Sequence, residues 1–229
     1  MSKKSIIILV SVGGLIILLA GVGGWYFYQQ SQVLTPEKLL VSFENKDPNL
    51  TSENFQVFNQ KFEETKARLQ ANADSFNDWL YLGVLKKGVG DYEGARDVFI
   101  YAGQIRPQSS TSFANLADLY AYFLNDPQQA EVNIKQAIVN EPNDYNFYLS
   151  LADIYRYKFP DGAAKYEQTM LEALAKFPDN TNLIAPLAGF YKQTGQTQQA
   201  IEYLEKLLKL MPDNQAVKAE LVELKAQVK

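Results

Sequence analysis

The order of apolar and polar residues divides this chain into one uninterrupted apolar segment and a long stretch with helical periodicity. Residues 5–28 form a run of 24 positions without a charge. Beyond position 75, apolar residues recur three, four and seven positions apart, which places them on one face of a helix. The pattern therefore predicts an apolar membrane segment followed by a series of amphipathic helices.

The apolar segment is long enough to cross a bilayer, which takes roughly 20 residues. The aromatic cluster at 25–28 lies where an interfacial belt is expected. A cleaved signal peptide is the alternative, with 22–24 as its cleavage site, but its apolar region is typically about 7–15 residues long. A buried soluble helix would show a polar face, and none is present. We therefore expect residues 1–29 to be a short basic N-terminus and a single uncleaved transmembrane anchor in contact with the lipid bilayer.

The charges that flank this segment predict its orientation. Lys3 and Lys4 precede it, whereas residues 29–36 carry no charge. Positive residues favour the cytoplasmic side. The N-terminus is then cytoplasmic, and everything after the anchor is extracytoplasmic.

Four similar units follow one another between 76 and 214. The first contains Trp79, Leu82 and Gly83 early, and Ala95, Phe99, Ala102 and Pro107 late. The prolines that close successive units lie 35, 36 and 34 residues apart, at Pro107, Pro142, Pro178 and Pro212. The units are 76–109, 110–144, 145–180 and 181–214.

Within each unit the residue types predict two packed helices. Small residues recur where paired helices would cross, at Gly83, Ala117, Ala152 and Ala188. Each closing proline is followed two positions later by a good N-cap, at Ser109, Asp144, Asn180 and Asn214, and Ser75 has this role before the first unit. Three residues depart from the regular pattern. Lys86 stands where tyrosine is usual, and Tyr166 stands where alanine is usual. Pro186 lies early in a first helix, where a proline removes a backbone hydrogen bond and can kink the helix.

The flanking segments also predict helices. Residues 215–229 place Val217, Leu221, Leu224 and Val228 on one face, as expected of a capping helix. In the connector 30–75, Thr35 and the following proline predict a helix start, with a helix over about 36–44. A second helix over 52–71 carries an apolar face, made of Phe55, Phe58, Phe62 and Leu69.

These positions match the signature W-x2-L-G-x2-Y, A-x3-F and P of about 34 residues. The chain resembles membrane-anchored bacterial tetratricopeptide-repeat (TPR) proteins. The resemblance implies an all-α fold: a right-handed TPR helical solenoid of about four repeats, with an N-terminal helix pair, a C-terminal capping helix and one N-terminal transmembrane helix. Members of this family typically act as adaptors, assembly factors or chaperone-like proteins.

The resemblance also implies where a partner binds, because the first helices of TPR units line a concave face. The residues expected there are Lys87, Asp118, Tyr122, Asp153, Arg156, Tyr157 and Lys192. The alternative is that these seven residues form only a solvated surface of the solenoid and bind no partner. Some TPR domains bind the C-terminal carboxylate of a chaperone through lysines and asparagines on these helices. Here the corresponding inward positions are Val84, Asp118, Asp153 and Gly189. The two aspartates among them would repel a carboxylate. A basic or aromatic-containing peptide is the better match.

A second aromatic series, Trp79, Phe113, Tyr148, Tyr120, Tyr155 and Tyr191, occupies positions that pack between helices in such repeats. We therefore expect core side chains there rather than a stacking platform for sugars or bases.

Composition narrows the chemistry further. The chain has no cysteine and no histidine, which removes thiol nucleophiles, imidazole bases and the common zinc ligands. Its 26 acidic and 22 basic residues give a net charge of −4, and no basic stripe suited to nucleic acid is present. We expect no enzyme activity, no cofactor, no metal site and no nucleic-acid partner.

The function that this sequence favours is a membrane-tethered adaptor or assembly factor that binds a protein or peptide partner in the concave groove. Two alternatives stay open. A holdase-like chaperone for exported polypeptides would need a promiscuous apolar groove, yet the chain has only three methionines. A cell-wall enzyme would need an enclosed cleft, for which about 200 residues of open solenoid are too few.

Overall fold

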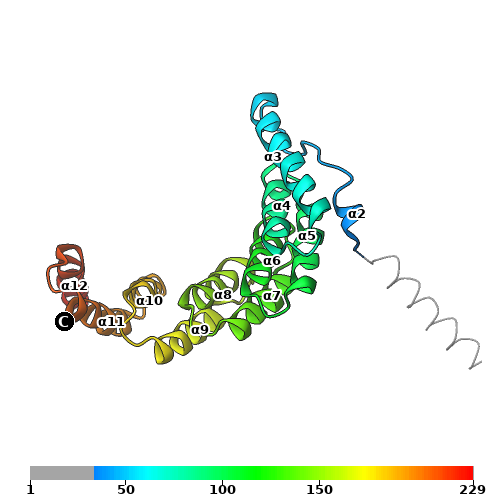
Figure 1. Ribbon diagram of the computed structural model, residues 1–229. Helices are drawn as coiled ribbons and strands as arrows, with labels where there is room; N and C mark the ends of the chain where they lie inside the picture. The colour runs from blue at the N-terminus through cyan, green and yellow to red at the C-terminus, as the bar shows by residue number, and fades with distance from the viewer. Residues whose placement is uncertain (1–33, 229) are drawn as a thin grey trace, which may run out of the picture. The chain divides into compact units, whose positions relative to one another are not determined.

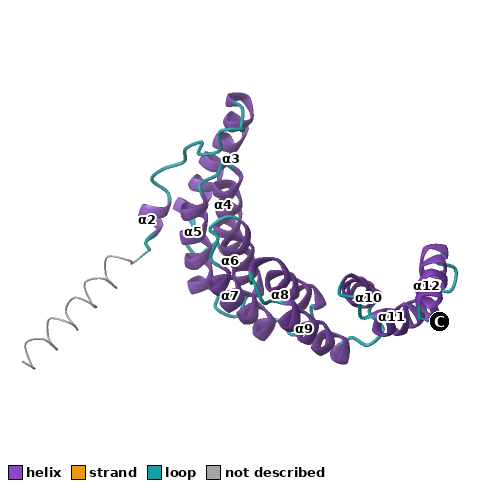
Figure 2. Ribbon diagram, turned by 180° about the vertical axis from the view of Figure 1, so that it is seen from behind, coloured by secondary structure: helices purple, strands orange, loops and turns teal. Residues whose placement is uncertain are grey.

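The computed structural model describes residues 34–228, and all regular elements in this range are α-helices (Figure 2). The described residues belong to two units, which divide between residues 43 and 44. The helix bounds are α2 Pro36–Leu39, α3 Ser52–Ala71, α4 Phe76–Gly88, α5 Tyr92–Ile105, α6 Ser110–Tyr122, α7 Pro127–Asn140, α8 Tyr145–Lys158, α9 Ala163–Lys176, α10 Thr181–Gln193, α11 Thr197–Leu210 and α12 Gln215–Gln227. The expected all-α solenoid is confirmed for this part of the chain.

In the first unit, the described residues contain only α2. Thr35 is its N-cap and a proline follows at the first helical position, as the sequence predicts. The helix nevertheless ends at Leu39, so the predicted range of 36–44 is too long. Short helices are marginal in water without extensive packing.

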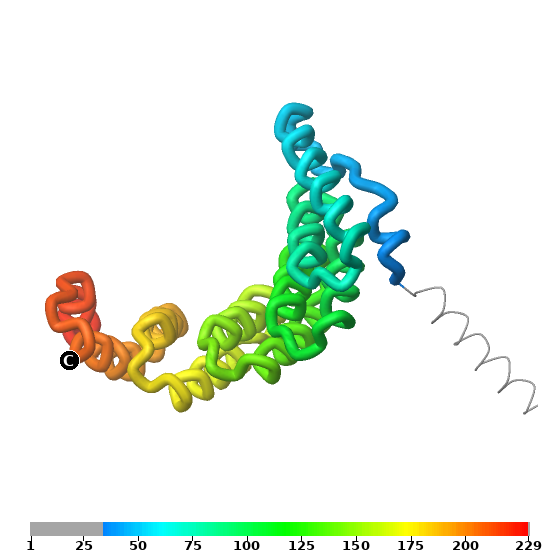
Figure 3. Tube along the Cα trace, viewed as in Figure 1, coloured from blue at the N-terminus to red at the C-terminus, as the bar shows by residue number. Residues whose placement is uncertain are grey.

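In the second unit, helices α3 to α12 follow one another as a curved row of antiparallel neighbours (Figures 1 and 3). The pairs α4–α5, α6–α7, α8–α9 and α10–α11 lie within the four predicted repeat ranges, and α12 ends the row. The first helix of each pair faces the inner side of the curve, and the second faces the outer side (Figure 1). A surface shared by α4, α6, α8 and α10 therefore lies on the inner side.

Local chemistry sets where these helices start. The side chains of Ser109, Asp144, Asn180 and Asn214 each accept a hydrogen bond from a backbone N–H of the helix that follows. These four N-cap predictions are confirmed. Ser75 differs, because its hydroxyl donates instead to the carboxylate of Asp78, at 2.6 Å. Each cap satisfies a donor that the first turn leaves without an intrahelical acceptor.

Close crossing within a pair requires a small residue on the first helix. A Cβ added to Gly83 would lie 2.4 Å from Cε1 of Phe99, a fully buried ring on α5. The equivalent residues Ala117, Ala152 and Ala188 are likewise buried. The small-residue series thus marks helix crossings, as predicted.

Two hydrogen bonds with the same spacing join successive pairs. The Tyr155 hydroxyl on α8 donates to Glu131 on α7, and the Tyr191 hydroxyl on α10 donates to Glu167 on α9, each at 2.8 Å. Burial and the neighbouring carboxylate both raise the pKa of Tyr191, so this hydroxyl stays protonated as the donor. These tyrosines are 5% and 3% exposed, which confirms their predicted core placement. Trp79 is fully buried, whereas Phe113, Tyr120 and Tyr148 are half-buried.

The turn between α4 and α5 holds a buried ionic cluster. The Lys86 ammonium lies 3.0 Å from one carboxylate oxygen of Asp91, and the Lys46 ammonium lies 2.5 Å from the other. The segment that carries Lys46 docks beside this turn, because the backbone N–H groups of Lys46 and Asp47 donate to the carbonyl of Val89. Lys86, which departs from the tyrosine usual at this position, therefore helps to hold the turn.

The other two irregular positions are accommodated differently. Tyr166 is 1% exposed, and its ring packs against Phe190 with centroids 4.6 Å apart. Helix α10 runs through Pro186, whose side chain is exposed. The α3 helix spans the predicted range of 52–71, with Phe62 and Leu69 buried, but Phe55 and Phe58 are only half-buried.

Between residues 34 and 228, none of the helices is both long enough and apolar enough to cross a bilayer. The predicted anchor at 5–28, within 1–29, lies outside the described residues.

Candidate functional site

The seven residues expected on the concave face all lie on first helices of the pairs. Lys87 is on α4, Asp118 and Tyr122 are on α6, Lys192 is on α10, and α8 carries the other three. The structure does not gather all seven at one place. Three of them, Asp118, Tyr122 and Asp153, line a single cavity between α6 and α8.

This cavity has a volume of about 180 Å³. Its apolar wall comes from α6, α7 and α8, and it includes Ala117, Ile134, Phe147 and Ile154. Small-molecule sites usually measure about 300–1,000 Å³, so this cavity suits a single side chain better than a whole small ligand. Sequence reasoning missed the apolar wall, because Phe147 and Ile154 follow the same helical spacing as ordinary core residues.

One acidic group of the cavity is already paired. Asp118 forms an ion pair with Lys87 from the preceding repeat, and the Lys87 ammonium also lies 4.5 Å from the ring centroid of Phe123. The pair is partly exposed, so its contribution to stability is small. It neutralises Asp118 and links α4 to α6.

The second acidic group, Asp153, is half-buried and makes no hydrogen bond or ion pair with any residue of the range 34–228. Burial raises the pKa of its carboxyl, and the nearby Arg156 charge opposes this only partly. Removing a carboxylate from water without a partner is unfavourable. Asp153 is therefore ready to accept a charge partner from outside the chain.

Two tyrosines border this region with exposed rings. Tyr122 is 48% exposed, and the Lys158 ammonium lies 4.5 Å from its ring centroid. Burial and the charges of Asp153 and Asp118 raise the pKa of Tyr122, which keeps its hydroxyl protonated as a donor. Tyr157, which lies on α8 one turn after Asp153, is 63% exposed. Exposed tyrosines provide contact area at low entropic cost.

The two remaining predicted residues interact with other parts of the protein. The Arg156 guanidinium donates to the side chain of Gln193, and it lies 5.0 and 5.6 Å from the ring centroids of Tyr166 and Phe190. Lys192 forms an exposed 2.7 Å ion pair with Glu220 on α12. Both side chains connect successive repeats, and neither lines the cavity between α6 and α8.

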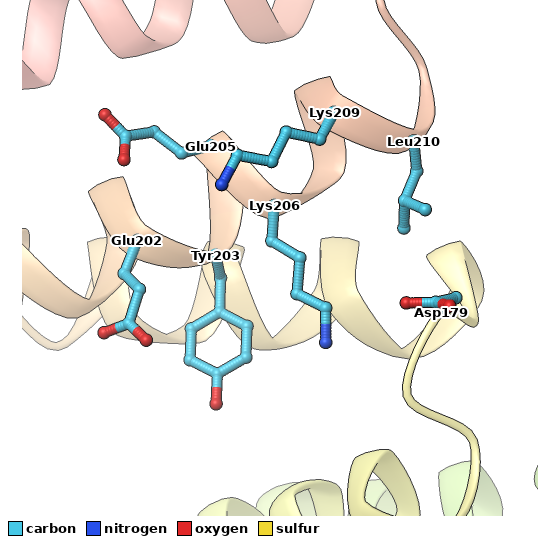
Figure 4. A pocket seen from close by; sticks show the side chains of 7 residues that line it. All are labelled: Asp179, Glu202, Tyr203, Glu205, Lys206, Lys209 and Leu210. Atoms are coloured by element: carbon cyan, nitrogen blue, oxygen red, sulfur yellow. The ribbon is translucent and has the colours of Figure 1, made fainter.

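A larger hollow of about 520 Å³ lies along the outer helix α11. Figure 4 shows that Glu202, Glu205, Lys206 and Lys209 extend from this helix, with Asp179 on the turn after α9. Charges of both signs alternate there, as is usual on a solvated helix face. Within residues 34–228, no group of three or more acidic residues is placed to hold a metal ion.

The stacked helix pairs with a side-chain-sized cavity on their inner side define a TPR-type helical solenoid. A family model described as tetratricopeptide repeat matches residues 158–228, which extend from the end of α8 to α12. The match covers less than half of the chain, and the remainder of the likeness is structural.

Among solved structures, MamA has a TM-score of 0.56 and 16% sequence identity over 75% of this chain and 97% of its own. PilW, described as a widely conserved type IV pilus biogenesis factor, has a TM-score of 0.54 and 18% identity, with 75% and 80% covered. YrrB, described as a TPR protein with an unusual peptide-binding site, has a TM-score of 0.50 and 15% identity, with 73% and 88% covered. At these identities the likeness establishes the fold alone.

Proposed function

We propose that this protein is an adaptor or assembly factor that holds a peptide segment of a partner protein against the inner face of its solenoid. The observation that carries the proposal is the cavity between α6 and α8, where the unpaired Asp153 lies beside the exposed Tyr122. A preformed cavity with a few polar groups is typical of binding sites. The peptide-binding and biogenesis roles described for YrrB and PilW are compatible with this function.

The geometry favours an extended peptide that crosses several first helices. The exposed Val84 on α4, Tyr122 on α6 and Tyr157 on α8 lie on helices that share the inner side of the row (Figure 1). Gly189 on α10 leaves open space, since a Cβ added there would meet no atom within 4 Å. A peptide along this face can contact side chains from successive repeats without any rearrangement of the helices.

Site-specific photo-crosslinking in cells tests this function. A photoreactive phenylalanine analogue at Tyr122 or Tyr157 is expected to capture one dominant partner, because both rings face the proposed path of the peptide. The same analogue at Val139, which is 70% exposed on the outer helix α7, is the matched control and should not capture that partner. Mass spectrometry identifies the products.

Other outcomes would contradict the adaptor function. Identical products from all three positions would mean that capture reflects exposure alone. A broad mixture of unfolded polypeptides from Tyr122 and Tyr157 would favour a holdase instead. The absence of any product at either tyrosine would contradict the adaptor function.

We further propose that the solenoid is tethered to the outer side of a membrane by residues 5–28, with the N-terminus in the cytoplasm. The support is the uncharged apolar run and the preceding Lys3 and Lys4. A reporter that is active only in the cytoplasm, fused after Lys229, should stay inactive. The same fusion with residues 5–28 deleted should become active. Activity of the intact fusion would mean that the solenoid lies in the cytoplasm, the opposite of the proposed orientation.

A further inference from the structure

The cavity between α6 and α8 contains one carboxylate that the chain does not neutralise by direct contact. Asp118 is held by Lys87, whereas Asp153 has no ion pair or hydrogen bond to the described part of the protein. We infer that this cavity receives the side chain of a lysine or arginine from the bound peptide, with Asp153 as its charge partner. This inference rests on the proposed peptide-binding function and specifies its ligand.

The cations near the cavity do not fill this role, because each is engaged elsewhere. The Lys87 ammonium contacts Asp118 and the Phe123 ring, on the side of α4. Arg156 is directed toward α9 and α10, where it meets Gln193 and the ring of Tyr166. The Lys158 ammonium lies over the ring of Tyr122. The charge of Asp153 is therefore left for a ligand.

The lining of the rest of the cavity suits a long basic side chain. Lysine and arginine combine an apolar stem with a charged end, and the stem packs readily on apolar surface. Phe147, Ile134 and Ile154 line the cavity and provide that surface. Tyr122 lines the same cavity and adds contact area for the stem.

The volume sets the size of the guest. About 180 Å³ holds one extended side chain, and it is smaller than the sites that enclose whole small molecules. A glutamate or aspartate of the peptide would instead bring a second negative charge next to Asp153 and the Asp118 pair, which is unfavourable. Selectivity for positive over negative side chains follows from these charges.

Binding of degenerate peptide mixtures to the full-length protein tests the inference. The mixtures are identical except for a fixed central residue, which is lysine, arginine, norleucine or glutamate, and they are immobilised through an uncharged linker. The lysine and arginine mixtures should bind at least about tenfold more tightly than the norleucine and glutamate mixtures. Norleucine is the matched probe, because it keeps the apolar stem and lacks the charge.

Variants locate the preference at this cavity. Asp153→Asn should remove most of the preference for lysine over norleucine, and Asp153→Lys should shift the preference toward glutamate. Asp213→Asn makes the same charge change at an exposed position on the turn before α12, and it should leave the preference intact. Circular dichroism of each variant checks that the helices are retained.

Three results would overturn the inference: equal binding of the norleucine and lysine mixtures, an unchanged preference in a folded Asp153→Asn variant, or no binding of any mixture. The crosslinking experiment separates this from a failure of the proposed function. If a partner is captured at Tyr122 while Asp153→Asn has no effect, only the ligand class is wrong. If the lysine preference holds and no partner is captured, only the adaptor function is wrong.

Discussion

Replacing Tyr166 with alanine is expected to lower the free energy of unfolding by about 3–5 kcal/mol, the usual cost of truncating a buried aromatic residue. Comparison of the repeats alone favours the opposite result, because the other three pairs have alanine here, at Ala95, Ala130 and Ala200. In the structure, however, the Tyr166 ring is 1% exposed and contacts both the Phe190 ring and the Arg156 guanidinium. Removing the ring would leave a cavity where α8, α9 and α10 meet.

Urea denaturation followed by circular dichroism measures this change. Tyr166→Phe is the matched control, since it keeps the ring and removes only the hydroxyl, and it should cost no more than about 0.5–1.5 kcal/mol. Equal stability of the wild-type protein and the alanine variant would show that the helices around residue 166 move together and fill the space left by the ring. In that case Tyr166 would be dispensable for packing.

The second large effect is expected for Asp91→Asn, with a loss of about 3 kcal/mol, at the lower end of the range for breaking a buried ion pair. The Lys86 and Asp91 side chains are only 4% and 7% exposed. The substitution preserves shape and the capability to cap α5, but it removes the charge that Lys86 and Lys46 both face. Asp97→Asn, which breaks the more exposed pair with Arg96 on the same helix, is the control and should cost less than about 1 kcal/mol.

The pH dependence provides a separate measurement of the same cluster. Burial alone would raise the pKa of Asp91, but hydrogen bonds and charge from Lys46 and Lys86 outweigh it and hold this pKa below its usual value. Because the folded-state pKa is depressed, the stabilisation is complete above the unfolded-state value of about 3.9 and is lost as the pH falls toward the folded-state pKa. The stability difference between wild-type protein and Asp91→Asn should therefore shrink below about pH 4. A stability difference that does not change with pH would mean that the charge of Asp91 is not its cause.

Local rules explain why much of the helix arrangement could be predicted. An N-cap such as Asp144 or Asn214 bonds to a backbone group only two or three residues away, so its role depends little on the rest of the fold. Apolar spacing likewise predicted the bounds of α3, and small residues such as Ala152 marked helix crossings. These signals act over a few residues, which is why a single sequence contains them.

The features that could not be predicted depend on contacts between distant segments. The buried Lys86 pairs with Asp91, whose other carboxylate oxygen pairs with Lys46. Lys46 lies 45 residues before Asp91 and is positioned by backbone hydrogen bonds to Val89. Tyr166 looked like an irregularity because its partner Phe190 belongs to the next repeat. Helical periodicity states which face a residue occupies, and it leaves open which side chain from another repeat will meet it.

The same limit applies to the candidate site. The resemblance to TPR repeats placed seven residues on the concave face of the first helices, yet of these only Asp118, Tyr122 and Asp153 line the cavity between α6 and α8. Arg156 and Lys192 have side chains long enough to reach Gln193 and Glu220 on neighbouring helices, and those contacts depend on the angle between repeats. The same contacts between repeats determine that Asp118 has an ion-pair partner and that Asp153 has none among the described residues.

The row of helices in the second unit makes its tertiary contacts chiefly between helices adjacent in sequence, with a direct contact of α6 and α8 in addition. Short sequence separations between contacting residues favour fast folding, because little loop entropy is lost before each contact forms. During synthesis, α4 and α5 can pair as soon as both have emerged, and each later pair adds to a finished edge. The growing chain therefore needs to expose only the apolar face of its most recent pair, which limits the surface open to aggregation until the next helix packs on it.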